Sequence, residues 1–349
     1  PGEPGTRGVI GLIGKKIFKE LVFPLVDPVL GEVGTSLARR LETARWPYRV
    51  RAFTPGDYAQ DEAAPIDRDG WSRLGRGRAL LMVHGTFSRS HLAFAQWPQA
   101  DMAALHQLYD GRVFAFDHFT LSADPKANVE WLVSQMPDDV DLTLDIVCHS
   151  RGGLVSRVLS EKQAELSLGS RRVRVGKVVL VGVPNAGTAL ADPEHVSTVL
   201  DVFTNLMNFL PDNGVTDVMT MVVEAAKMMA VGALGGLDGL RAMRPGGEFA
   251  TWLNAGARGG GTSYYAVASN VTPTEPGLRH FAVSRGLNAV LHGANDFVVP
   301  ADGVFAANGS DYFPVDERLV LDGADAAPHT RYFADSRVRA KVLGWLHTP

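Results

Sequence analysis

The sequence has 349 residues, with 34 Lys and Arg against 38 Asp and Glu, and 46% of its residues are hydrophobic. These figures exclude a mainly disordered chain, which would combine low hydrophobicity with high net charge. The slightly acidic balance argues against a dedicated nucleic-acid-binding protein. The single cysteine, Cys148, excludes an intrachain disulfide and favours a reducing compartment, so we expect a cytoplasmic protein. Because the sequence starts at Pro1 rather than Met, an earlier export signal stays open.

Residues 1–45 form the first expected unit, a helical segment packed on the main domain. Apolar residues recur there at helical spacing, at Ile10, Ile13, Ile17 and Leu21. Three lysines between positions 15 and 19 leave open a helix that lies on a membrane surface. No apolar run of the chain reaches the roughly 18 uncharged residues that cross a bilayer.

Residues 46–349 form the second expected unit, in which short β-rich runs alternate with helical patterns. The expected strands are residues 48–53, 78–84, 112–117, 143–148, 175–183, 264–269 and 287–292. The expected helices are residues 94–108, 128–135, 152–162 and 335–346. This alternation predicts an α/β fold with a mostly parallel sheet, and the apolar strands predict helices on both faces.

An insertion at about residues 189–249 interrupts the alternation. Its apolar residues repeat at helical spacing, and six of the nine methionines fall between Met207 and Met243. Methionine is an adaptable side chain suited to surfaces that fit varied apolar groups. The insertion is therefore either a lid facing an apolar substrate or an ordinary buried pair of helices.

The stretch from Leu142 to Arg157 carries the strongest chemical signal. An apolar strand ends at Cys148, a sharp turn follows at Ser150, and a helix opens at two glycines. A serine at such a strand-to-helix corner is pushed out of the sheet, as in the G-x-S-x-G nucleophile elbow. Cys148 replaces the first glycine of that pattern and is small enough for the turn to form. Ser150 is the expected nucleophile.

Two backbone N–H groups are expected to bind an oxyanion beside Ser150. The helix after the elbow supplies the N–H of Arg151, and the loop after an earlier strand supplies the N–H of Thr86, next to the small residue Gly85. His84 ends that strand before the nucleophile, and we interpret it as a structural imidazole bound to nearby backbone rather than as a catalytic base.

A serine nucleophile needs an imidazole to take its proton and a carboxylate to orient the imidazole. His329 lies in a loop shortly before the final helix, and Asp296 lies in a turn just past a predicted strand. Both follow Ser150 in the chain order acid, then histidine. Rival acids are Asp322 and Asp325. The other downstream histidines are His195, His280, His292 and His347.

These motifs together resemble the lipase-like branch of the α/β-hydrolases, which includes bacterial lipases and the relatives of GPI inositol-deacylase and lecithin-cholesterol acyltransferase. The matching segments run in family order over about 250 residues: 84–86, 148–153, 183–188, 295–300 and 328–330. The resemblance implies an α/β-hydrolase fold, a Ser150–Asp296–His329 triad, and a lid entered near residue 188 and left near residue 243. Arg151 departs from the family pattern. Its side chain could favour a polar or anionic acyl substrate or point into solvent.

The function expected from this resemblance is a serine hydrolase that cleaves carboxylic esters through an acyl-enzyme. Two alternatives stay open: an acyltransferase on the same triad, and a non-catalytic binding or scaffold module. We expect a small-molecule or lipid ester substrate and no nucleic-acid partner. A peripheral membrane contact through the lid or the N-terminal helix stays open. The sequence predicts no cofactor and no catalytic metal, while a structural calcium ion, which some family members hold, stays open.

Overall fold

The computed structural model describes residues 30–192, 195, 198, 201–202, 206, 237–255, 261–272, 290–291, 293–307, 311–312 and 315–348. Most of the predicted insertion and residues 1–29 lie outside this part, so the expectations for the lid and for the helical pattern at residues 10–21 do too. The division into units 1–45 and 46–349 stays a proposal.

The described residues form a seven-stranded sheet in the order β1-β3-β2-β4-β5-β6-β9. β1 pairs antiparallel with β3, and all the other neighbours are parallel. The strands are β1 (Arg49–Ala52), β2 (Arg78–Val83), β3 (Val113–Asp117), β4 (Leu142–His149), β5 (Val173–Val181), β6 (Ser263–Asn270) and β9 (Glu317–Asp322). A separate two-stranded ladder joins β7 (Ala306–Ala307) and β8 (Asp311–Tyr312).

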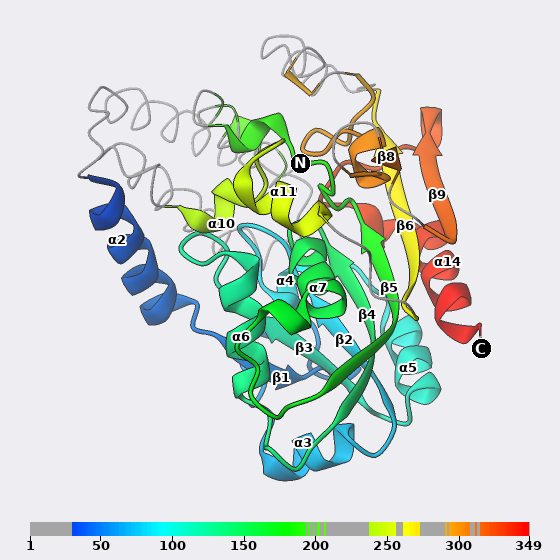
Figure 1. Ribbon diagram of the computed structural model, residues 1–349. Coiled ribbons are helices and arrows are strands. Elements are labelled where there is room, and N and C mark those ends of the chain that lie inside the picture. Colours follow the sequence, from blue (N-terminus) through cyan, green and yellow to red (C-terminus); the bar gives the residue numbers. More distant parts are fainter. Residues whose placement is uncertain are drawn as a thin grey trace, which may run out of the picture.

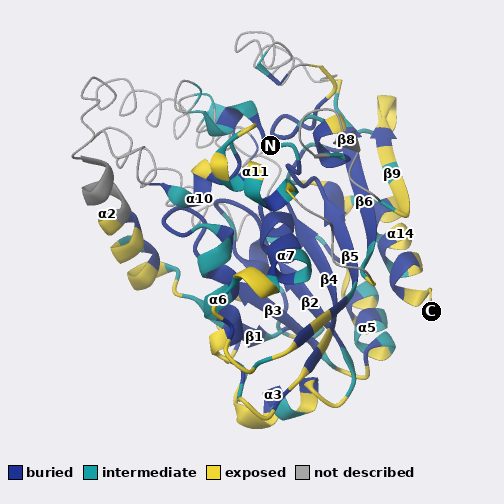
Figure 2. Cartoon of the chain, viewed as in Figure 1, coloured by how far each residue is buried: buried dark blue, intermediate teal, exposed yellow. Residues whose placement is uncertain are grey.

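Helices cover both faces of the sheet, as the strand composition predicts. α3 (Arg68–Leu74), α6 (Pro125–Ser134) and α7 (Gly152–Glu161) pack in one apolar core, and α5 (Gln99–Leu108) and α14 (Ser336–His347) pack in the other. Figure 1 shows these two groups on opposite sides of the strands, and Figure 2 shows the central strands between them mostly buried, while the edge strand β9 is mostly exposed. The remaining helices are α2 (Leu30–Arg45), α4 (Ser90–Ala93), α10 (Asp238–Arg241) and α11 (Glu248–Asn254).

Six of the seven predicted strands are confirmed, and the prediction of a strand at 287–292 is wrong for the two residues described there. Val290 is helical and Leu291 lies in a turn. The seventh strand is instead β9, an edge strand with mostly exposed side chains, whose apolar run is only three residues long and is flanked by charged residues.

The helix predicted at residues 94–108 begins only at Gln99. Pro98 has an extended backbone and stands at the N-cap, where the missing proline N–H costs nothing. Side-chain caps explain other helix starts: the carboxylate of Asp124 accepts a hydrogen bond from the N–H of Ala127, and Asp335 does the same for Arg337.

The parallel strands point their carboxyl ends at one edge of the sheet, and the predicted site residues follow several of them. Thr86 comes shortly after β2, and Ser150 comes directly after β4. Open α/β sheets bind ligands at this edge. The topology therefore predicts the position of the site.

Candidate active site

Ser150 occupies a strained turn between β4 and α7. Its φ angle is +54°, in the left-handed region that a residue with a Cβ rarely adopts. The N–H of Ser150 donates a hydrogen bond of 2.9 Å to the carbonyl of Val181, at the end of β5, so the neighbouring strand holds the turn. This is the geometry that the elbow motif predicts.

Two glycines let the loop after β2, residues 84–88, pack against the elbow. A Cβ at Gly85 would lie 2.5 Å from the Cβ of Ser150, and a Cβ at Gly152 would lie 2.4 Å from the carbonyl oxygen of His84. Both distances are too short for a side chain. The end of β2 and the start of α7 therefore approach each other only because these two residues are glycines.

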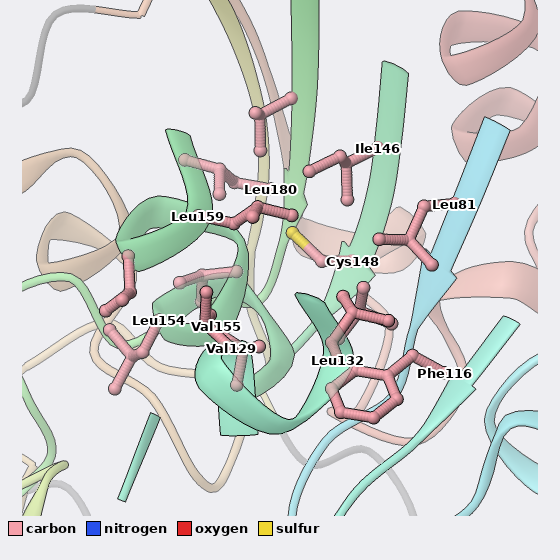
Figure 3. Close-up of a cluster of buried hydrophobic side chains, with 14 of the residues drawn as sticks. Leu81, Phe116, Val129, Leu132, Ile146, Cys148, Leu154, Val155, Leu159 and Leu180 are labelled. Atoms are coloured by element: carbon pink, nitrogen blue, oxygen red, sulfur yellow. The ribbon is translucent and has the colours of Figure 1, made fainter. Parts of the chain in front are cut away.

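Cys148 fits the elbow because its side chain turns into the core. It is fully buried, and Figure 3 shows it among the apolar side chains of β4, β5 and α7. Burial raises the pKa of its thiol to about 12, so the thiol stays protonated and is no rival nucleophile. The first elbow glycine is replaced here without a change in the turn.

Asp296 and His329 form a buried pair. His329 Nδ1 and Asp296 Oδ2 are 2.7 Å apart, and each side chain is only 1% exposed. The backbone of His329 is also held, since its N–H donates to the carbonyl of Asp296 and its carbonyl lies 2.9 Å from Nε2 of His149, the residue before Ser150. The structure thus brings the predicted acid and base together beside the elbow.

The free nitrogen of His329 is available for chemistry. Nε2 is buried and has no hydrogen-bond partner in the part of the chain that the structure describes, so Ser150 Oγ does not donate to it in this state. Catalytic hydrogen bonds are often completed only when substrate binds. A buried imidazole nitrogen without a partner is costly in a purely structural role.

The carboxylate of Asp296 is held as an anion. Burial acts to raise its pKa, but the charge and hydrogen bond of His329 and the N–H groups of Val298 and Val299 outweigh burial and lower the pKa below the usual range. Those two N–H groups donate to Oδ1 at 2.9 and 2.7 Å. An anion beside Nδ1 keeps the imidazole in the tautomer that leaves Nε2 free to accept a proton.

The rival residues have other surroundings. Asp322 and Asp325 are exposed; Asp322 accepts hydrogen bonds from Asn270 and Gly323, and Asp325 pairs with Arg337. His347 is exposed at the end of α14. His280 and His292 lie outside the described residues, and His195 is half-buried beyond η2 (Ala189–Ala191).

The two predicted oxyanion donors have free N–H groups. Within the described residues, neither the N–H of Thr86 nor that of Arg151 donates a hydrogen bond. The hydroxyl of Thr86 turns away toward Met243, with Oγ1 3.7 Å from Sδ. The next residue, Phe87, has a φ of +53°, so this loop is strained like the elbow.

His84 is structural, as its position predicts. It is fully buried, its Nδ1 lies 2.9 Å from the carbonyl of Gly85, and its Nε2 accepts a hydrogen bond from the N–H of His118. Burial lowers the pKa of His84 to about 4, so the ring is neutral. Its role is to join the end of β2 to the end of β3.

The guanidinium of Arg151 takes neither of the two positions that the sequence leaves open. It faces neither a substrate nor solvent, because it is fully buried behind the elbow. Nε donates to the carbonyl of Gly239 in α10, and the two terminal nitrogens donate to the carbonyls of Phe119 and Ala123. The side chain therefore ties the elbow to the loop after β3 and to the far end of the insertion.

Glu42 of α2 holds the opposite side of the same loop. Its carboxylate is 3% exposed and accepts hydrogen bonds from the N–H groups of Thr120, Leu121 and Ser122 and from the hydroxyl of Ser122. The 118–124 loop is thus fixed between a buried anion on its N–H side and a buried cation on its carbonyl side. Glu42 belongs to no sequence motif, and its partners lie 78 to 80 residues away, so the sequence pattern does not predict this role.

Replacing Glu42 with alanine is expected to lower the free energy of unfolding by about 2–4 kcal/mol, because three buried N–H groups lose their acceptor. Urea denaturation measures the loss. The matched control is Glu62→Ala, since Glu62 is exposed and should change stability by less than about 0.5 kcal/mol. Equal stability of the two variants would contradict the structural role of Glu42.

Asp117 is a second residue that the sequence analysis missed. It ends β3, is 2% exposed, accepts a hydrogen bond from the N–H of Ser90 and pairs with Arg49 and Arg89. Burial acts to raise the pKa of this carboxyl, but the arginines and the hydrogen bond hold it far below its usual range. Asp117 therefore anchors the chain just after the loop of residues 84–88.

Two other features of the described part bear on chemistry. Its residues hold no group of three or more His, Cys, Asp or Glu side chains placed to bind a metal ion. None of its helices is long and apolar enough to cross a membrane.

Known structures share this fold. Lipase 1 from Pelosinus fermentans is similar with a TM-score of 0.50 and 13% identity, over 77% of this chain and 97% of that one. A lipase from Staphylococcus hyicus has a TM-score of 0.46 and 11% identity, over 77% and 93% of the two chains. A metagenomic carboxyl esterase has a TM-score of 0.40 and 17% identity, over 90% and 87%. At these identities the likeness shows the fold alone.

Comparison at the level of sequence gives a family but no characterised relative. No curated protein matches the sequence. A family model with the description Domain of unknown function (DUF7379) matches residues 45–347, which is most of the chain. The chain therefore belongs to this family, and its fold is that of the α/β-hydrolases.

Proposed function

We propose that the protein is a serine hydrolase that cleaves carboxylic esters through an acyl-enzyme. The observation that carries the proposal is the buried Asp296–His329 pair, whose imidazole packs 4.8 Å from the ring of His149, the residue before the strained Ser150. Lipases and a carboxyl esterase among the structures with a similar fold agree with it.

In the proposed mechanism, Ser150 Oγ attacks the ester carbonyl and His329 Nε2 takes its proton. The N–H groups of Thr86 and Arg151 stabilise the oxyanion, and Asp296 stabilises the imidazolium. His329 then gives the proton to the departing alcohol. Water, deprotonated by the same imidazole, attacks the acyl-enzyme and restores Ser150.

Turnover of p-nitrophenyl esters of increasing acyl length tests this function and its substrate class. We expect hydrolysis, with kcat/KM rising toward medium or long acyl chains because the proposed lid carries most of the methionines. A short-chain preference would replace the lipase-like reading with a simple esterase. Absence of turnover at every length would favour a binding module.

Acyl transfer on the same triad is separated by product analysis. With an added alcohol acceptor, a hydrolase yields mostly the free acid, because water resolves the acyl-enzyme. An acyltransferase yields mostly the new ester.

A further inference from the structure

The carboxylate of Asp296 accepts a hydrogen bond from one group more than the proposed triad requires. The hydroxyl of Tyr332 donates to Asp296 Oδ2 at 2.8 Å, and this is the same oxygen that faces His329 Nδ1 at 2.7 Å. A carboxylate only accepts hydrogen bonds, so the tyrosine is the donor. With two N–H groups on Oδ1, all four acceptor positions of the carboxylate are in use.

The fold makes room for this contact. Gly182 follows β5 with a φ of +58°, and a Cβ there would lie 2.8 Å from Cε2 of Tyr332 and 3.3 Å from Asp296 Oδ2. The ring can therefore lie beside the pair because residue 182 is glycine. Tyr332 is 1% exposed, as are Asp296 and His329, so solvent competes little for these hydrogen bonds.

We propose that Tyr332 is a positioning residue that lowers the proton affinity of His329 by sharing the Oδ2 oxygen of Asp296. The inference rests on the proposed serine hydrolase function. An anion beside an imidazole favours the imidazolium, and a hydrogen bond to that anion draws off part of its charge. Tyr332 thus keeps His329 neutral, and able to take the proton of Ser150, at lower pH than the pair alone would.

The other groups that face the pair do not titrate in the same range. Burial raises the pKa of Tyr332 well above its usual value, so the hydroxyl stays a donor. His149, at the end of β4, packs its ring 4.8 Å from that of His329, and burial lowers the pKa of His149 to about 3. Neither Tyr332 nor His149 therefore supplies the acidic limb of a pH profile near neutral pH.

The test is the rate at which a fluorophosphonate probe labels Ser150, measured from about pH 5 to about pH 9 in wild type and Tyr332→Phe. Without the hydroxyl, the Asp296 carboxylate keeps more of its negative charge beside the imidazole, so the acidic limb of the labelling profile should move up by about 0.5 pH units or more. The labelling rate on the alkaline plateau should change far less.

The chain offers a matched control in Tyr109→Phe. The hydroxyl of Tyr109 donates to the buried carboxylate of Asp145 at 2.7 Å, in the middle of β4 and five residues before Ser150. This variant loses the same kind of hydrogen bond and should lose similar thermal stability, yet its acidic limb should stay at the wild-type position. A merely structural Tyr332 would behave like Tyr109.

The proposal for Tyr332 is overturned if the acidic limbs of wild type and Tyr332→Phe coincide, or if the limb of the variant moves to lower pH. Neither result contradicts the proposed hydrolase function. A wild-type protein that the probe does not label overturns both. If Tyr332→Phe does not fold, tyrosine is replaced biosynthetically by 3-fluorotyrosine, a stronger donor. The acidic limb should then move to lower pH, and an unmoved limb overturns the proposal.

Discussion

Replacing Ser150 with alanine is expected to abolish labelling by a fluorophosphonate and to lower ester hydrolysis by on the order of 10³- to 10⁶-fold. The reason is that no other group can form the acyl-enzyme: Cys148 faces the core as a protonated thiol, and the elbow presents only the serine hydroxyl. Removing one oxygen should leave the fold intact, because no described contact of the elbow depends on the hydroxyl.

The matched control is Ser156→Ala on the same helix. Ser156 is also buried, and its hydroxyl donates to the carbonyl of Gly152. Labelling should persist in this variant, and circular dichroism should show both variants folded. Undiminished labelling of Ser150→Ala would place the nucleophile elsewhere.

Replacing Asp296 with asparagine is expected to lower kcat by about 10³- to 10⁴-fold. Both carboxylate oxygens face donors, with two N–H groups on one side and His329 and Tyr332 on the other. An amide has only one oxygen, so its NH₂ must face donors in either orientation. Either His329 then loses its hydrogen bond to residue 296, or the N–H groups of Val298 and Val299 lose theirs.

The rival acid supplies the control for this variant. Asp322→Asn changes an exposed carboxylate in a turn and should leave kcat unchanged. Steady-state hydrolysis of one p-nitrophenyl ester measures both variants. If Asp322→Asn fell by the larger factor, Asp296 would not be the acid.

The parts of the site that the sequence predicts are those that local pattern and chain order determine. Ser150 is found because an apolar strand, a serine and two glycines lie within a few residues, and His84 because it ends a strand. Asp296 and His329 are predicted from their order after Ser150, acid and then histidine. The strand expected before Asp296 is wrong at residues 290 and 291, so the strand-end argument for Asp296 does not hold there.

The parts that the sequence does not predict depend on where long side chains go. Arg151 reaches acceptors that lie 28 to 88 residues away, and nothing beside it in the chain marks Ala123 or Gly239 as partners. Tyr332 is three residues from His329, but tyrosine belongs to no motif that would place its hydroxyl on Asp296. β9 escapes detection because its apolar run is only three residues long and charged residues flank it.

Glu42 lies upstream of residue 45, where the match to the family begins. The support for the 118–124 loop, and through Arg151 for the elbow, therefore crosses the boundary of the segment that matches the family. Recombinant fragments trimmed to that boundary would lack the anchoring anion, so expression plasmids for this protein should retain α2.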